Sequence, residues 1–145
     1  MTPHRAGQVE IGYWPIEPTE AGRSMMSWPS HVYHWHREGF EHVSGAELLA
    51  VGKTFENQAI RVGPAAYGLQ FHPEVTHAMI CRWTVRAEER LKLPGAQDRV
   101  RQIEGRLMHD PHVAAWLDAF LDHWLGGQSR AAAPARRYGT NTRNR

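Results

Sequence analysis

The 145-residue sequence carries 17 basic and 15 acidic side chains, a formal net charge of +2, and 41% hydrophobic residues. A chain of this size is long enough for one domain with its own hydrophobic core and too short for two. It contains no apolar run of 18 residues, no charged and apolar leader after Met1, and a single cysteine, Cys81, which cannot form an internal disulfide. We therefore expect a cytoplasmic protein that does not enter a membrane.

The first half of the chain shows the period of β-strands. Val9, Ile11 and Tyr13 alternate with polar or small residues, which predicts a half-buried strand, and a proline-punctuated connector follows over residues 17–30. Residues 31–36 alternate again and predict a second strand. Three further apolar runs, at 46–51, 57–62 and 66–71, are separated by short turns and predict an antiparallel meander.

The second half switches to the period of helices. Apolar residues recur every four positions from 75 to 91, after the predicted N-cap Thr76, and indicate an amphipathic helix. A second, more polar helix is predicted over residues 97–108. A third is predicted to begin with Asp110 as N-cap and Pro111 as its first helical residue.

The predicted third helix ends at Gly126-Gly127, where the composition changes. Residues 127–145 contain five arginines and no acidic residue. They predict a disordered basic tail behind a domain that spans residues 1–126. Five positive charges attract nucleic acid weakly, but no base-reading motif accompanies them, so a nucleic-acid function is not expected.

The predicted meander ends in a histidine and a carboxylate separated by one proline. In the stretch Gly68–Glu74, Pro73 holds His72 in an extended conformation, and residues two apart point to the same side of an extended chain. A carboxylate that binds one imidazole nitrogen fixes the tautomer and stabilises the imidazolium, which leaves the other nitrogen to accept a proton. His72 and Glu74 are therefore candidate catalytic residues.

Tyr67–Glu74 resembles the His-x-Glu signature of class I glutamine amidotransferases. The segments His34–Phe40, Ala46–Ala50 and Asn57–Ala59 resemble, in order and spacing, the subgroup similar to the amidotransferase domain of GMP synthase. The resemblance covers about residues 8–125 and implies an α/β fold: part of a three-layer, flavodoxin-like amidotransferase domain, with a mixed sheet that includes the antiparallel meander and is followed by C-terminal helices.

The same resemblance implies the chemistry. His72 would be the general base and Glu74 its orienting partner in a Cys-His-Glu triad that releases ammonia from glutamine, the small-molecule substrate. His36 would lie at the mouth of the active site and bind substrate. No cofactor and no metal ion are implied.

The chain departs from the family at the nucleophile. In the family a cysteine lies on a Gly-x-Cys-x-Gly elbow N-terminal to these segments, whereas Cys81 follows the His-x-Glu pair within a predicted helix. We therefore expect the C-terminal portion of an amidotransferase domain, inactive alone. The alternative is a non-catalytic amidotransferase-like protein that binds a partner, either a separate N-terminal half or a second copy of itself.

The histidine pair His34 and His36, and the single cysteine Cys81, could each have a structural or a functional role. His34 and His36 lie on one face of their predicted strand, as paired imidazole ligands can, but no third ligand stands at a recognisable spacing. We expect a polar strand edge there and no metal. Cys81 is expected to be a buried helical thiol.

Overall fold

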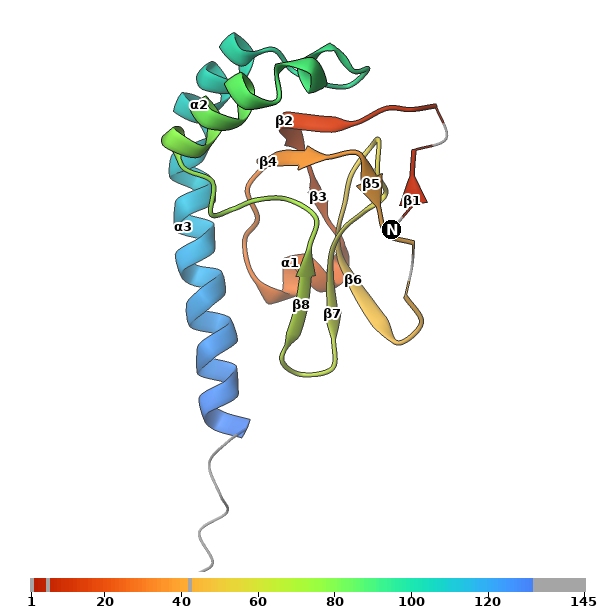
Figure 1. Ribbon diagram of the computed structural model, residues 1–145. Helices are drawn as coiled ribbons and strands as arrows, with labels where there is room; N and C mark the ends of the chain where they lie inside the picture. The colour runs from red at the N-terminus through yellow and green to blue at the C-terminus, as the bar shows by residue number, and fades with distance from the viewer. Residues whose placement is uncertain (1, 5, 42, 132–145) are drawn as a thin grey trace, which may run out of the picture.

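The computed structural model describes residues 2–4, 6–41 and 43–131. Its elements combine short strands in the first half with helices in the second, as Figure 1 shows. They are β1 (Thr2–Pro3), β2 (Glu10–Pro15), β3 (Glu17–Pro18), α1 (Glu20–Met25), β4 (His31–His36), β5 (Glu38–Gly39), β6 (Ala46–Val51), β7 (Asn57–Val62), β8 (Ala66–Leu69), α2 (His77–Arg86), a 3-10 helix (Glu88–Lys92) and α3 (Arg99–Ala131).

The strands of the described residues form three antiparallel groups. The meander predicted from the three apolar runs is confirmed, since β6 pairs with β7 and β7 with β8, and β3 joins its outer edge. β2 and β4 form a separate ladder in which Glu10 is opposite His36 and Gly12 is opposite His34. A third, two-stranded group joins β1 to β5. The predicted α/β class is confirmed.

β2 is buried on both faces over Glu10–Tyr13, whereas its alternating sequence predicted a half-buried strand. The segment that precedes α3 covers its free edge. The side chain of Gln97 accepts a hydrogen bond from the Tyr13 N–H (3.0 Å) and donates one to the Tyr13 carbonyl oxygen (2.7 Å). This coverage explains how a charged side chain on β2 comes to lie inside the protein.

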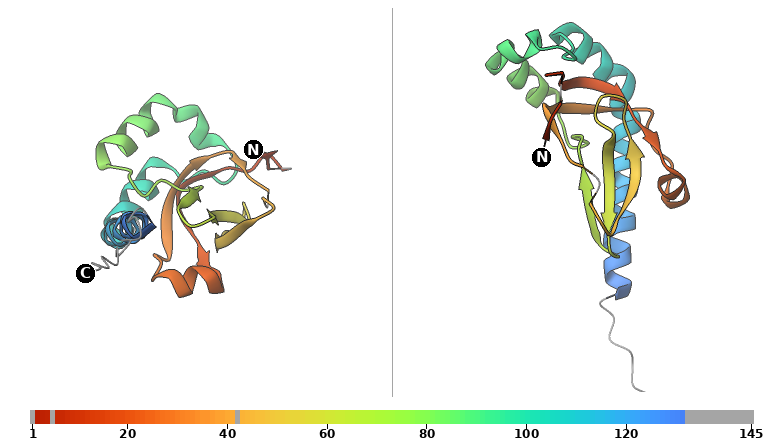
Figure 2. Two further views of the ribbon diagram at one scale, coloured as in Figure 1. Left: turned by 90° about the horizontal axis from the view of Figure 1, so that it is seen from below. Right: turned by 90° about the vertical axis from the view of Figure 1, so that its right-hand side faces the viewer.

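The main hydrophobic core lies between the meander and α3, which runs along one side of the strands (Figures 1 and 2). The stripe predicted for the third helix, which includes Val113, Trp116 and Phe120, faces this core. Trp116 stacks on Phe120 with 5.0 Å between ring centroids and packs on Phe71 at 5.5 Å. A second, smaller cluster of Tyr13, Tyr33 and Ile80 joins the β2–β4 ladder to α2.

The helices differ from their prediction at Pro111. Residues 99–131 form one continuous helix with Pro111 inside it, so the predicted break between residues 108 and 110 is wrong. Asp110 does not cap a helix, because its carboxylate accepts a hydrogen bond from the Tyr13 hydroxyl and pairs with Arg106 one turn earlier (2.9 Å). These contacts, together with the buried stripe that follows, keep the chain helical through the proline.

Other predicted boundaries of helices and connectors also differ from those in the structure. The connector predicted over residues 17–30 contains β3 and the helix α1, whose N-cap Thr19 accepts a hydrogen bond from the Gly22 N–H (3.1 Å). The first predicted helix is confirmed with Thr76 as N-cap, but α2 ends at Arg86. α3 continues past the predicted stop at Gly126-Gly127, and residues 132–145 of the predicted tail lie outside the described part of the chain. None of the helices described could span a bilayer, since none is both long and apolar enough.

Candidate active site

His72 and Glu74 lie on the loop that links β8 to α2. Phe71, near the start of this loop, is 3% exposed and anchors the loop in the main core. The backbone N–H of His72 donates a hydrogen bond to the carbonyl oxygen of Tyr33 on β4 (2.8 Å). The loop is therefore attached to the β2–β4 ladder as well as to the meander, which defines the position of the histidine.

The structure brings the predicted pair together. His72 Nδ1 lies 2.8 Å from Glu74 Oε1, and the two side chains are 36% and 55% exposed. The His72 ring packs edge-on against Trp83 of α2, with 5.4 Å between centroids. Because Nδ1 faces the carboxylate, it carries the proton, and Nε2 is left as the basic nitrogen; it makes no hydrogen bond to a described residue. This arrangement suits a general base, and the catalytic role itself stays a prediction.

Cys81 lies elsewhere on α2. It is half-buried rather than fully buried, and its Sγ is 3.4 Å from Nε2 of His77, one helical turn away. The contact with His77 is the hydrogen-bond contact that the Cys81 side chain makes among the described residues. No hydrogen bond there joins Cys81 to His72. The geometry thus pairs the thiol with a different histidine from the candidate base.

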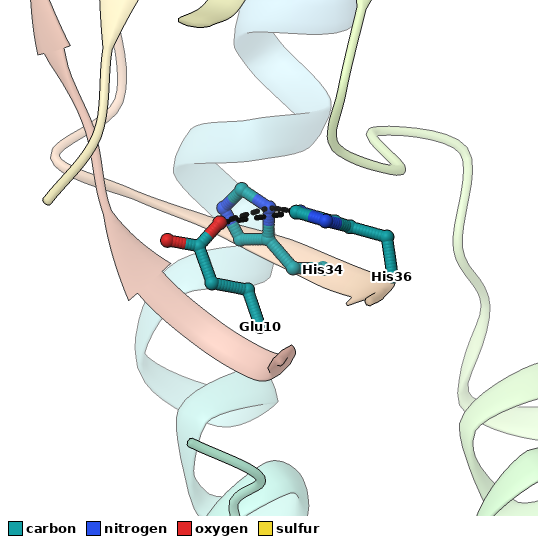
Figure 3. Close-up of side chains that lie close together, drawn as sticks. All are labelled: Glu10, His34 and His36. Carbon is teal, nitrogen blue, oxygen red and sulfur yellow. Dashed lines mark hydrogen bonds and ion pairs between the residues drawn. The ribbon is translucent and has the colours of Figure 1, made fainter. Parts of the chain in front are cut away.

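A second polar cluster lies between β2 and β4, and it joins the histidine pair His34 and His36, which the sequence pattern indicated, to Glu10, which it did not. Glu10 faces both histidines of the strand opposite, as Figure 3 shows. Glu10 Oε2 is 3.2 Å from His36 Nε2 and 3.5 Å from His34 Nδ1, and the two nitrogens are 3.0 Å apart. Their side chains are 4%, 9% and 0% exposed, in the order Glu10, His36, His34.

Further contacts hold this cluster in place. The Gln58 side-chain amide donates to Glu10 Oε2 (2.9 Å) and to the Phe55 carbonyl oxygen (2.9 Å). His36 Nδ1 lies 3.1 Å from the carbonyl oxygen of Glu38. Glu10 and His36 are therefore oriented by groups from β5, β7 and the loop between β6 and β7.

The surroundings decide the charges of the buried groups. Burial lowers the pKa of His34 to about 3, although the Glu10 carboxylate opposes the shift, so the ring is neutral at pH 7. Burial alone would raise the pKa of Glu10, but the hydrogen bond from His36, the neighbouring His34 and the Gln58 amide outweigh it and hold this pKa below its usual value. The carboxylate therefore remains ionised inside the protein.

The position of His36 bears on its predicted role. Both of its ring nitrogens face groups of the protein, Glu10 and Glu38, and its ring packs on Phe55 with 4.9 Å between centroids. Substrate binding by His36 stays a prediction. The sequence did not mark Glu10 as a partner of the histidines, because it is a single carboxylate between apolar strand residues. Only the pairing of β2 with β4 brings it opposite His36.

Comparisons with known proteins support the fold. No protein-family model matches the sequence, and no curated protein matches it significantly. The structure is similar to the crystal structure of a glutamine amidotransferase from Methylobacillus flagellatus (TM-score 0.77, 19% identity), covering 99% of this chain and 59% of that one. It is also similar to a glutamine amidotransferase from Thermotoga maritima (TM-score 0.68, 22% identity), covering 86% of this chain and 54% of that one.

The chain thus spans between half and three fifths of the length of these two proteins. The similarity confirms the predicted fold, that of a class I glutamine amidotransferase-like protein. At these identities it says nothing about the activity of this chain.

Proposed function

We propose that this chain supplies the general base and its orienting carboxylate for the hydrolysis of glutamine to glutamate and ammonia. The observation that carries the proposal is the 2.8 Å contact between His72 Nδ1 and Glu74 Oε1, on a loop of an amidotransferase-like fold. The resemblance of residues 34–40 to the GMP synthase-like subgroup supports assignment to that subgroup, in which the ammonia passes to an acceptor.

The proposed reaction needs a cysteine beside His72. His72 Nε2 would take the thiol proton, the thiolate would attack the glutamine carboxamide, and the imidazolium would return the proton to the departing ammonia. Water then cleaves the thioester, and backbone N–H groups hold the oxyanion. Glu74 stabilises the imidazolium throughout.

Cys81 does not fit this role, because its thiol contacts His77. The nucleophile of the proposed site therefore comes from a Gly-x-Cys-x-Gly segment other than these 145 residues, joined to the chain or supplied separately. By this proposal the 145-residue chain alone releases no ammonia from glutamine.

The experiment measures ammonia release in two steps. The purified chain should show only background, and activity that disappears in Cys81→Ser would make Cys81 the nucleophile and contradict the proposal. Fusing or adding an elbow segment encoded next to this chain should then produce glutaminase activity. His72→Ala should abolish that activity, while the control His77→Ala, at the first residue of α2, should retain it.

The alternative function is a non-catalytic protein that binds a partner through its amidotransferase-like fold. Large apolar side chains on α3 favour it: Val100, Leu107 and Met108 are 65%, 71% and 62% exposed. Such side chains are a plausible contact for an N-terminal half or for a second copy of the chain. Size-exclusion chromatography with light scattering distinguishes these partners, since only self-association depends on the concentration of the chain alone.

A further inference from the structure

The atoms at the centre of the cluster between β2 and β4 have the spacing of metal ligands. Glu10 Oε2, His34 Nδ1 and His36 Nε2 are separated by 3.0, 3.2 and 3.5 Å. Ligand atoms that each lie about 2.0–2.1 Å from a tetrahedral zinc ion are about 3.3 Å apart. Figure 3 shows the three side chains converging on one point from two strands.

The donors and acceptors at that point are compatible with a bound cation. The Glu38 carbonyl oxygen can only accept, and it lies 3.1 Å from Nδ1 of His36. A neutral His36 ring with its hydrogen on Nδ1 has the lone pair of Nε2 facing Glu10 Oε2 and His34 Nδ1. That lone pair can bind a metal ion or, without one, accept a hydrogen bond from Nδ1–H of His34.

Contacts around the cluster orient two of its three side chains. His34 is the exception, since its Nε2 is buried without a hydrogen-bond partner among the described residues, and its Nδ1 faces the other two ligand atoms. The side-chain amide of Gln58 donates a hydrogen bond to the carboxylate of Glu10. The backbone carbonyl oxygen of Glu38 faces Nδ1 of His36, the ring nitrogen that points away from the cluster. Outer contacts of this kind orient the imidazole and carboxylate ligands of metal ions in proteins.

We propose that Glu10, His34 and His36 bind one divalent transition-metal ion, with Zn²⁺ the ion that matches them best. Two imidazoles and one carboxylate suit zinc and its neighbours in the first transition series, whereas Mg²⁺ and Ca²⁺ prefer oxygen ligands alone. Three protein ligands leave one tetrahedral position for water or a further group. The proposal is independent of the proposed glutaminase activity.

A bound ion would connect β2 to β4, the strand whose Tyr33 holds the His72 loop.

Binding can be tested on metal-free chain, prepared with a chelator and desalted. This chain should bind Zn²⁺ with one ion per chain in isothermal titration calorimetry. The thermal midpoint should rise with Zn²⁺ concentration, because the ion binds the folded state. Binding of no Zn²⁺ by the folded chain would overturn the proposal.

Variants identify the ligands. His36→Gln and Glu10→Gln should weaken Zn²⁺ binding by on the order of 100-fold or more, since each removes one of three ligands. The matched control is His31→Gln, the same substitution on the same strand, because the His31 ring stacks on His109 with 4.4 Å between centroids, away from the cluster. Unchanged affinity in a folded His36→Gln chain would overturn the proposal.

Cys81 and His77, whose side chains contact each other on α2, could also take up zinc, so this pair needs its own control. Cys81→Ser should retain the Zn²⁺ affinity of the wild type. Co²⁺ added to the metal-free wild type should give visible d–d absorption without a thiolate charge-transfer band, a result that does not depend on the folding of any variant. A thiolate band would place the ion at Cys81 and overturn the proposal.

Discussion

The backbone N–H of His72 donates a 2.8 Å hydrogen bond to the carbonyl oxygen of Tyr33, which attaches the loop of the candidate base to strand β4. Tyr33 is fully buried, and its hydroxyl donates to Gln102 Oε1 of α3 (2.8 Å). Its ring packs edge-on against Tyr13 of β2 with 5.2 Å between centroids. One residue thus joins the candidate site to β2, β4 and α3.

The buried phenol of Tyr33 makes stability depend on alkaline pH. Burial raises the pKa of Tyr33 well above its usual value of 10.0. Above about pH 10 the unfolded chain releases a proton that the folded chain keeps, so the free energy of unfolding should fall by about 1.4 kcal/mol per pH unit for this group. Urea unfolding between pH 8 and pH 11 measures the slope.

Tyr33→Phe should flatten that slope while lowering stability near pH 8 by about 1–3 kcal/mol, because Gln102 loses its buried partner. Tyr13→Phe should flatten the slope as well, since burial, with the carboxylate of Asp110, raises the pKa of Tyr13. A slope that is the same in wild type and Tyr33→Phe would show that this phenol ionises freely in the folded protein.

The main core gives a prediction about Trp116, which is 4% exposed and packs on three aromatic rings, including that of Trp28 at 5.1 Å. Trp116→Ala should lower the free energy of unfolding by about 3–5 kcal/mol, because it leaves a large cavity. Trp116→Phe should cost roughly 1–2 kcal/mol, since Nε1 is buried without a hydrogen-bond partner in the described residues and its removal is no loss. Equal losses of unfolding free energy in Trp116→Ala and Trp116→Phe, measured by urea unfolding, would mean that the indole N–H has a partner after all.

Local pattern predicted most of the strands and missed what depends on distant contacts. The bounds of residues 31–36, 46–51 and 57–62 are confirmed, because alternation and turn residues are local properties. β3 pairs with β6, about 30 residues away, and its two residues carry no pattern of their own. The loop pair His72 and Glu74 could be predicted for the same reason that the strands could, since they are two residues apart.

The cluster of Glu10, His34 and His36 shows the limit of the sequence at the site. The two histidines share a strand face and were recognised as a pair, but their third member lies 24 residues before His34. Only the antiparallel register, which places Glu10 opposite His36, brings it there. Contacts across strands are set by the tertiary structure, so spacing alone could not identify them.

Pro111 tests whether α3 is continuous. A proline inside a helix removes the hydrogen bond to the carbonyl four residues earlier, here Leu107, and costs up to about 3 kcal/mol relative to alanine. Pro111 is exposed, so Pro111→Ala should raise the free energy of unfolding, by about 1–2 kcal/mol after the greater freedom of the unfolded alanine chain is included. The control Ala115→Pro, one turn later on the exposed face, should lower it by about 3 kcal/mol.

A lower stability in Pro111→Ala would indicate that two helices meet at this proline, as the sequence pattern predicted. Thermal and urea unfolding of the three chains decide between the two arrangements, and helical content from circular dichroism should rise slightly in Pro111→Ala only.

The last prediction concerns the proposed triad, in the chain once an elbow segment has made it active. His72→Ala removes the base, whereas Glu74→Gln keeps the shape of the side chain and loses the charge that stabilises the imidazolium. Each should lower kcat by on the order of 100-fold or more. The double variant should be little worse than His72→Ala, because the two residues act as a unit.

Effects that multiply would show that Glu74 acts independently of His72, through the position of the loop rather than through the imidazolium.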